Sequence, residues 1–393
     1  MSRAAITFRN GRIFDGTQLV DGHAARFEDG QIAFLGPQAE APRTGQDVDL
    51  GGDILFPGYV DLQVNGGDGI LFNADPSVET LRRMARAHRG LGVTALLPTL
   101  ITDTAEITRA AIAATRAAIA ERVPGIVGLH LEGPHLSVAR KGAHDAALIR
   151  PMEAGDVQML LEAAQALPVL KITVAPESVT EDQVRALART GVLVSLGHSD
   201  AGFETCQRYF AAGARCVTHL FNAMSQLGNR EPGLVGAALA SGGVSAGLIA
   251  DAVHVHPATM RAAWQAKTGP GRIFLVSDAM AVAGSDAVEF ELGGRLIRRR
   301  NGILTLADGT LAGADLDLTT AVRTMVQSVG LPPGDALRAA TRTPADLIGL
   351  GYGFGPLSGA VRIANDLSRL VPVGSEAALP DAGGDIEADR SAS

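Results

Sequence analysis

The chain has 393 residues, a net charge of −8 and a hydrophobic fraction of 46%, enough for one large domain or a large and a small one. The acidic balance argues against a nucleic-acid partner, and the two cysteines, Cys206 and Cys216, form neither a disulfide framework nor a zinc ribbon. No signal-peptide pattern and no apolar run near the ~20 residues of a membrane span occur, so we expect a cytoplasmic protein without a membrane partner.

The first ~55 residues alternate short apolar segments with turn residues, which predicts a small β-rich unit. Strands then alternate with helices. The predicted strands are Tyr59–Val64, Thr94–Pro98, Ile126–Leu131, Leu170–Ala175, Val192–Leu196, Cys216–Leu220, Val244–Ala250 and Ile273–Val276. Helical spacing of apolar residues predicts helices at Val78–Leu91, Thr104–Arg122, Met152–Ala166, Glu181–Arg189, Phe203–Ala212 and Pro257–Lys267.

Eight strands, most of them separated by helices, over ~220 residues favour an α/β fold of the TIM type, a (β/α)8 barrel. A doubly wound sheet is the alternative, but no Gly-x-Gly-x-x-Gly follows an early strand. Hairpin segments and two helices follow, at Glu289–Leu292, Arg295–Arg300, Ile303–Leu306, Leu316–Val329 and Asp335–Ile348. The segment Val361–Leu367 is expected to rejoin the N-terminal β unit, and residues 375–393 are predicted to be a disordered tail.

Four of the apolar strands end in side chains capable of chemistry, namely Glu132, His198, His219 and Asp278. Singly, each has a structural explanation, such as a glutamate that caps the next loop. Barrel enzymes, however, build their sites from the C-terminal ends of several strands. One carboxylate and two imidazoles are a sound ligand set for one divalent metal, with Asp278 beside it as a general base.

Two features argue against a second metal. The first strand carries Gln63 and Asn65 where two histidines would serve a binuclear site better, and these amides are candidates for holding a metal-linked water. Lys171 lies well before the end of its strand and is interpreted as structural. We therefore expect one divalent metal per subunit, with Zn first and Fe, Co or Mn as alternatives.

A second group of residues suits an anionic, polar substrate. Arg230 follows the sixth strand and His254 the seventh, although Arg230 paired with Glu231 on a surface loop explains the spacing equally well. His144, after the Glu132 strand, is placed to hydrogen-bond a substrate oxygen. The segment 309–313, with a glycine at each end, is either a lid or a turn.

Taken together, these motifs come in a familiar order. They are Pro57-Gly58-Tyr59-Val60-Asp61, Gly128-Leu129-His130-Leu131-Glu132-Gly133-Pro134, Lys141-Gly142-Ala143-His144, Gly197-His198-Ser199, Thr218-His219-Leu220-Phe221-Asn222-Ala223-Met224, Arg230-Glu231-Pro232-Gly233, Asp251 with His254, and Ser277-Asp278-Ala279. From about Gly11 to Leu350, the chain resembles the N-acetylglucosamine-6-phosphate deacetylases of the amidohydrolase superfamily.

The resemblance implies a barrel at residues 56–349 and a small β-sandwich built from residues 1–55 and 350–374, usually in a homodimer. It implies Glu132, His198 and His219 as metal ligands and Asp278 as the base. The implied substrate-binding residues are Ala143, His144, Asn222, Ala223, Arg230, His254, Leu311, Ala312 and Gly313, with Arg230 reaching across the dimer interface. The implied substrate is an amino-sugar phosphate, with N-acetylglucosamine 6-phosphate converted to glucosamine 6-phosphate and acetate.

The chain departs from the family pattern at Asp315, where small hydroxyl residues are more usual, and in its last β segment. Three alternatives stay open. One is a deacetylase of another amino-sugar phosphate, such as N-acetylgalactosamine 6-phosphate, and another is a cyclic-amide hydrolase. The third is a barrel without catalysis that acts as a binding protein, which the intact set of four strand-end residues disfavours.

Overall fold

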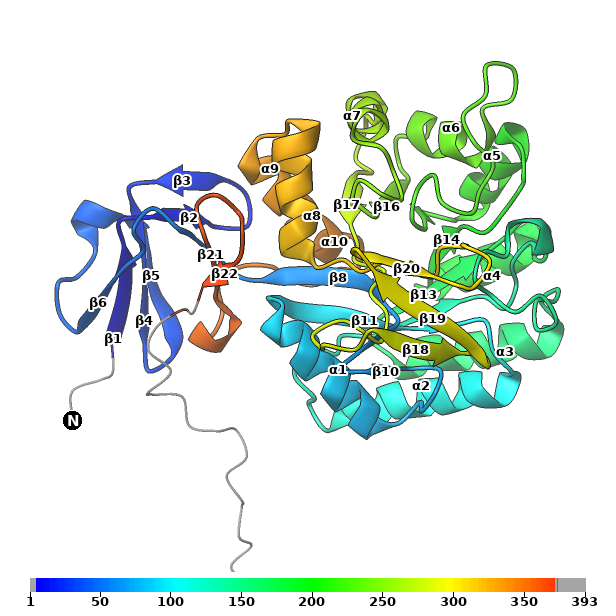
Figure 1. The fold of residues 1–393 in the computed structure, drawn as a ribbon, viewed down its shortest axis with the longest axis horizontal. Coiled ribbons are helices and arrows are strands. Elements are labelled where there is room, and N and C mark those ends of the chain that lie inside the picture. The colour runs from blue at the N-terminus through cyan, green and yellow to red at the C-terminus, as the bar shows by residue number, and fades with distance from the viewer. Residues whose placement is uncertain (1–4, 372, 374–393) are drawn as a thin grey trace, which may run out of the picture.

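The structure is a computed structural model that describes residues 5–371 and 373, so the tail predicted at 375–393 lies outside the described residues. Figure 1 shows a small unit of β-strands beside a larger body in which helices surround the central strands. Strand β8 leads from the first into the second.

The larger body is built on eight parallel strands that pair in chain order. They are β8 (Tyr59–Val64), β11 (Val93–Ile101), β12 (Leu129–Glu132), β13 (Leu170–Val174), β14 (Leu193–Leu196), β15 (Cys216–Val217), β16 (Ser245–Leu248) and β17 (Ile273–Leu275). The ring closes just beyond β17, where Ala279 pairs in parallel with Val64 and accepts a hydrogen bond of 2.8 Å from Asn65 N. The predicted barrel is confirmed, and the closing contact lies beside the predicted base, Asp278.

Helices cover the barrel and begin where the sequence supplies caps. They are α1 (Val78–Gly90), α2 (Ala105–Ala120), α3 (Ala154–Ala166), α4 (Glu181–Arg189), α5 (Phe203–Ala212), α6 (Gly233–Ala240), α7 (Pro257–Ala266), α8 (Leu318–Thr324), α9 (Pro333–Ala339) and α10 (Arg342–Leu347). At α1 the Ser77 hydroxyl accepts from Thr80 N, and at α4 Thr180 and Gln183 form a capping box. Each such cap stabilises its helix by about 1 kcal/mol.

The helix predictions fail in two places. α6 was not expected, because its residues 233–239 are all buried and the segment lacks the polar face on which helical periodicity depends. The single helix expected at Asp335–Ile348 is two helices, α9 and α10, separated by Thr341 at φ −138° and ψ −90°. Pro344 has no N–H to donate and is tolerated only in a first helical turn, so a new helix begins at Arg342.

Two sheets form the small unit. Their strands are β1 (Ala5–Arg9), β4 (His23–Glu28), β5 (Gln31–Pro37) and β6 (Gln46–Asp49) in one, and β2 (Arg12–Phe14), β3 (Leu19–Asp21), β7 (Ile54–Phe56), β21 (Val361–Ile363) and β22 (Leu370–Val371) in the other. Phe8, Phe27, Ile13 and Leu55 pack between them as a shared core. As predicted, the chain returns after the barrel, since β21 pairs antiparallel with β7.

A three-stranded insert follows the barrel strands and packs near the C-terminal end of β17. It consists of β18 (Glu289–Leu292), β19 (Arg295–Arg300) and β20 (Ile303–Thr305), and its apolar face packs with Leu71 of the short hairpin β9 (Gly66–Gly67) and β10 (Ile70–Leu71). Its last segment is fixed to the barrel mouth, because Ala314 N donates to Asp278 O at 2.9 Å. Within the described part of the chain, none of the helices is both long and apolar enough to cross a membrane.

Candidate active site

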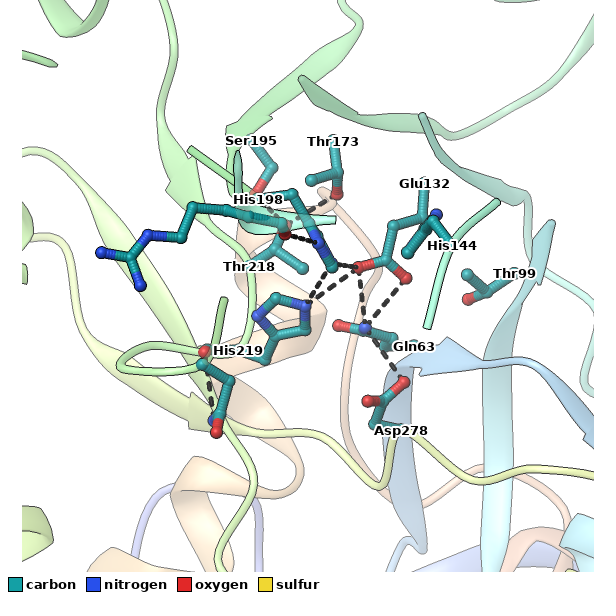
Figure 2. Close-up of polar contacts among 12 residues, drawn as sticks. Gln63, Thr99, Glu132, His144, Thr173, Ser195, His198, Thr218, His219 and Asp278 are labelled. Carbon is teal, nitrogen blue, oxygen red and sulfur yellow. Dashed lines mark hydrogen bonds and ion pairs between the residues drawn. The ribbon is translucent and has the colours of Figure 1, made fainter. Parts of the chain in front are cut away.

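The four predicted side chains meet at the C-terminal mouth of the barrel (Figure 2). Glu132 is the last residue of β12, and His198, His219 and Asp278 follow β14, β15 and β17 within three residues. All four are at most 9% exposed. The sequence pattern of apolar strands ending in polar residues therefore does place these groups together.

The backbone turns sharply at three of these positions. His198, His219 and Asp278 have φ values of 48°, 31° and 51°, in the left-handed region that non-glycine residues rarely adopt. Such conformations cost about 1–3 kcal/mol each and gather at functional sites. Here they end each strand and leave the side chain at the barrel mouth.

Glu132, His198 and His219 converge on one point. Glu132 Oε1 lies 3.2 Å from His198 Nε2 and 3.0 Å from His219 Nε2, and the two nitrogens are 3.0 Å apart. Burial would raise the pKa of Glu132, but the two imidazoles hold it well below its usual value. The glutamate is thus an anion that faces two ring nitrogens.

The proton positions make this cluster fit a metal. His198 Nδ1 lies 2.8 Å from the carbonyl oxygen of Arg140 and donates to it, so Nε2 of the neutral ring carries a lone pair. That lone pair faces the Glu132 carboxylate and His219 Nε2, so a proton or a metal cation has to lie between these atoms. Metal-binding histidines typically donate their other N–H to a carbonyl in this way. The donor set therefore suits one divalent metal.

Two amides connect this cluster to Asp278. Gln63 Nε2 lies 3.2 Å from Glu132 Oε2 and 3.1 Å from Asp278 Oδ1, and Asn65 Nδ2 donates to the same Oδ1 at 2.7 Å. Among the described residues, the buried oxygens of both amides have no hydrogen-bond partner, so they are open to a water or a ligand. Burial and the charge of Glu132 raise the pKa of Asp278, which makes it a better proton acceptor.

His144 is held as a hydrogen-bond donor. Its Nδ1 accepts from Thr102 N at 3.3 Å and lies 2.8 Å from Thr102 Oγ1, so the proton of the neutral ring is on Nε2. Burial, followed by the neighbouring His198, lowers the pKa of His144 to about 3, and the ring is neutral at physiological pH. Its Nε2–H is available to an oxygen of a ligand.

The Nδ1 atom of His254 has the opposite role to that of His144 and is a hydrogen-bond donor. Its Nδ1–H donates to Asp251 Oδ2 at 2.6 Å, while Asp251 Oδ1 accepts the backbone N–H groups of Val253 and His254. Asp251 is therefore fixed by its own loop and in turn fixes the ring. Among the described residues, His254 Nε2 has no hydrogen-bond partner, so it is available to a ligand.

A cavity of about 410 Å³ lies above these groups, a size that suits a small molecule such as a hexose phosphate. Of the predicted site residues, those on its wall are Asn65, Glu132, Ala143, His144, His198, His219, Asn222, Ala223, His254, Asp278, Leu311 and Gly313. Gln63 lies beneath the wall and reaches it only through Glu132 and Asp278.

Arg230 is not on the cavity wall. It lies in the exposed loop 226–231, and Glu231 does not pair with it but accepts the backbone N–H groups of Phe203 and Gly233. The alternative of a surface Arg230–Glu231 pair is therefore wrong. A role for Arg230 in a partner's cavity stays a prediction.

The segment after β20 forms one side of the cavity. Leu311 and Gly313 line it, whereas Ala312 is fully buried in the apolar core of the three-stranded insert. Gly313 has φ +63°, and a Cβ there would lie 2.4 Å from Met280, so only glycine fits. Asp315, the departure from the family pattern, is off the cavity wall and pairs with Arg299 at 2.7 Å.

Three residues of this site were not identified from the sequence. Arg140 lines the cavity and its carbonyl holds His198, while Asp251 and Thr102 fix His254 and His144. Arg140 lies directly before the Lys141–His144 motif, and Asp251 stands three residues before His254, so both had a local signal. Thr102 had none, because it is 42 residues from its partner.

Buried polar side chains contact one another next to the Glu132, His198 and His219 cluster, and Figure 2 shows those of Ser195, Thr218 and Thr173. Ser195 Oγ contacts Thr218 Oγ1 at 2.6 Å, Thr218 contacts Thr173 at 2.7 Å, and His130 bridges Thr173 and Thr99 at 2.7 and 3.1 Å. These side chains come from β11 to β14 and from the end of β15. They link the strands that carry Glu132, His198 and His219.

A barrel with two carboxylates and two imidazoles at its mouth is typical of metal-dependent hydrolases. Comparison with known proteins identifies the family within this class. A family model described as the amidohydrolase family matches residues 54–357. The chain is 48% identical to the N-acetylgalactosamine-6-phosphate deacetylase of Shewanella sp. (strain ANA-3), over 75% of this chain and 74% of that protein. It is 35% identical to the N-acetylglucosamine-6-phosphate deacetylase of Haemophilus influenzae, over 80% and 82% of the two chains.

Comparison with solved structures points to the same family. The N-acetylglucosamine-6-phosphate deacetylase from Pasteurella multocida superposes with a TM-score of 0.86 at 34% identity, over 93% of this chain and 97% of that one. The chain therefore belongs to the amidohydrolase family and, within it, to the N-acetylglucosamine-6-phosphate deacetylase family. Amidohydrolases are generally metal-dependent hydrolases, in keeping with the Glu132, His198 and His219 cluster.

Proposed function

We propose that the protein hydrolyses the acetamide of N-acetylglucosamine 6-phosphate to glucosamine 6-phosphate and acetate. The observation that carries this proposal is the cluster of Glu132, His198 and His219 beside Asp278, on the wall of a cavity of about 410 Å³. The names of the relatives support the substrate class, since they act on N-acetylated amino-sugar phosphates.

One divalent metal, with zinc expected first, would be held by Glu132, His198 and His219. It would supply a Lewis acid that polarises the acetamide carbonyl and acidifies the attacking water. Removal by a chelator should lower the melting temperature, because a bound metal stabilises only the folded chain, and zinc should restore it. A His198→Gln variant is the control, and an equal response in that variant would contradict the assignment.

Asp278 performs the proton transfers. Both amide donors reach its Oδ1, which leaves Oδ2 to accept the proton that the attacking water loses. As the C–N bond breaks, the same carboxyl group returns this proton to the departing amine nitrogen. His144 donates Nε2–H to the oxygen that gains negative charge. His254 binds the sugar or its carbonyl group, and Asn222 and Ala223 bind the phosphate.

The second candidate substrate is N-acetylgalactosamine 6-phosphate, because the relative that is 48% identical is named for it. The two sugars differ only in the configuration at C4. Acetate release should be measured from both phosphates and from unphosphorylated N-acetylglucosamine. Higher kcat/KM on the galactose epimer would replace the proposed substrate and keep the reaction. Equal activity on the unphosphorylated sugar would overturn the phosphate requirement.

We propose further that the protein works as a homodimer in which Arg230 binds the phosphate in the partner's cavity. The exposed loop 226–231 supports this, since it carries both Arg230 and Leu227, a large apolar side chain that is 59% exposed. Two inactive variants, Asp278→Asn and Arg230→Ala, should complement each other when they are unfolded and refolded together. At equal amounts, about a quarter of the activity should return, because half of the dimers would hold one intact site.

No recovery on co-refolding would place Arg230 outside the partner's site.

The predicted cytoplasmic location also stays a prediction, which fractionation of the native cells would test.

A further inference from the structure

A second cavity lies at the opposite end of the barrel from the active site. Its volume is about 650 Å³, and it is lined by residues at the N-terminal ends of β16 and β17, by Arg215 directly before β15, by the end of α7, and by α9 and α10. Figure 1 shows these helices around β16 and β17. None of its lining residues belongs to the active-site cavity.

The side chains that line this second cavity, called the basal cavity below, carry more positive than negative charges. Both of its acidic residues are already paired, Asp335 with Arg338 at 2.8 Å and Asp346 with Arg342 at 2.6 Å. The walls therefore carry no carboxylate that is free to neutralise a further cation.

Three more cations line the same cavity, namely Arg215, Lys267 and Arg272. Within the described part of the chain, none of the three forms an ion pair with a carboxylate. Three positive charges without a carboxylate partner around one cavity, two of them exposed arginines, stand out in a chain whose net charge is −8. Such a concentration attracts anions and raises their local concentration.

The surroundings of Lys267 are the strongest evidence for an anion site. It is only 7% exposed, and its ammonium group donates to a single described acceptor, the Ser241 carbonyl oxygen at 2.6 Å. Burial and the nearby charge of Arg272 lower the pKa of Lys267, so its charge is held in an unfavourable environment. An anion in the cavity would supply the missing hydrogen bonds and the missing charge.

Trp264 adds an aromatic side chain to the lining of the same cavity. The indole is half-buried and lines the cavity, and its N–H has no partner among the described residues. Aromatic faces of this kind stack against flat rings, and a cavity of this volume holds a molecule of nucleotide size. The cations and the indole together suit a ligand with a charged end and a flat end.

We propose that the basal cavity binds a small molecule that carries a diphosphate group, either inorganic or attached to a nucleoside. Arg215, Lys267 and Arg272 hold the phosphates, and Trp264 contacts the rest of the ligand. The site is separate from the deacetylation chemistry and does not depend on which amino sugar is the substrate.

Trp264 is the one tryptophan of the sequence, so the tryptophan fluorescence of the protein reports on this site. The full-length, metal-loaded protein should be titrated with potassium pyrophosphate and with ADP while tryptophan emission is recorded, against potassium chloride at matched ionic strength. We expect a saturable change with either ligand. Tighter binding of ADP would identify a nucleoside diphosphate, and equal binding would identify the diphosphate group alone.

Two variants make the test specific. Arg272→Ala and Arg215→Ala should each weaken binding about tenfold or more, because each removes a charge that no carboxylate compensates. Arg300→Ala is the matched control, an exposed arginine on β19 outside the cavity, and should leave the titration unchanged. A response of the same size in Arg272→Ala and the unmodified protein would overturn the proposal, as would no response to either ligand at millimolar concentration.

Discussion

At the level of single residues, the two histidines His144 and His254 on the wall of the active-site cavity have opposite hydrogen-bonding roles. His144 Nδ1 accepts a hydrogen bond from the backbone N–H of Thr102, which leaves Nε2–H as a donor. His254 Nδ1–H donates to Asp251, which leaves its Nε2 as an acceptor in the neutral ring. A donor and an acceptor on the same wall can bind a substrate that offers a carbonyl oxygen and hydroxyl groups, as an acetylated sugar does.

The Asp278→Asn variant should lose turnover while it keeps its metal. Asparagine can still accept from Gln63 and Asn65, but it cannot take up the proton of the attacking water, so kcat should fall about 10²–10⁴-fold. Acetate release and metal content measured on the same preparation would check this. Near-normal turnover with metal bound would exclude Asp278 as the base.

The Asp251→Asn variant should weaken substrate binding through His254 without unfolding the loop. The amide oxygen can still accept the backbone N–H groups of Val253 and His254, but the charged acceptor for the ring is lost. We expect kcat/KM to fall about tenfold or more, as for other residues that orient a functional histidine. Asp308→Asn, on an exposed turn, is the control. Equal kinetics for both variants would show that Asp251 has no positioning role.

Sequence could locate Glu132, His198, His219 and Asp278 because each follows an apolar strand, and barrel topology alone brings strand ends together. It could not give their proton positions. The tautomer of His198 depends on the Arg140 carbonyl, 58 residues away in the chain, and a carbonyl oxygen is present at every residue. Contacts of this kind leave no trace in the pattern of side chains.

At the level of secondary structure elements, the buried hydroxyls near Glu132, His198 and His219 connect neighbouring strands. The chain of contacts from Ser195 through Thr218, Thr173 and His130 to Thr99 lies just below the ligand positions. Every member is at most 1% exposed, so each hydroxyl depends on its neighbours for hydrogen bonds. The contacts hold the strands in register where they deliver Glu132, His198 and His219.

Replacing Thr218 with valine should therefore destabilise the barrel. The valine has nearly the same shape but leaves Ser195 and Thr173 each short of a partner, at a cost of about 1–3 kcal/mol in the free energy of unfolding. Denaturant unfolding would measure the loss, and Thr218→Ser, which keeps the hydroxyl, should recover most of it. If valine and serine were equally stable, the hydroxyl contacts would carry no stability.

The two helix predictions that failed did so for opposite reasons. Periodicity identifies a helix only if one face is polar, and α6 has no such face because neighbouring helices α5 and α7 cover it. The break between α9 and α10 has the opposite cause, because the apolar spacing continues through Thr341 while Pro344 forces a new start. The amphipathic helices α4 and α5, by contrast, were predicted at the bounds that the structure gives them.

At the level of the whole molecule, the small unit depends on a strand that arrives after the barrel is complete. β21 pairs with β7, the strand that leads into the barrel, and Arg362 on β21 pairs with Asp53 at 2.7 Å. Segments from before and after the barrel thus form one sheet of the small unit, beside the barrel. The active site and the basal cavity lie at opposite ends of that barrel, so ligands can reach both at once.

Two truncations should separate the closing strand from the predicted tail. A chain that ends at Gly359 loses β21, whose Val361 and Ile363 are 7% and 0% exposed, together with the Arg362–Asp53 pair. Each buried aliphatic side chain contributes about 1.5–3 kcal/mol, so this chain should melt markedly lower and expose β7 as an unpaired edge.

A chain that ends at Gly374 keeps β21 and lacks only the predicted tail, and its melting temperature and acetate release should match those of the full chain. Thermal unfolding of all three chains, with light scattering to detect association through the exposed edge, would check both outcomes. Equal stability of the Gly359 and Gly374 chains would mean that β21 is dispensable, and that the N-terminal strands support the small unit without the returning segment.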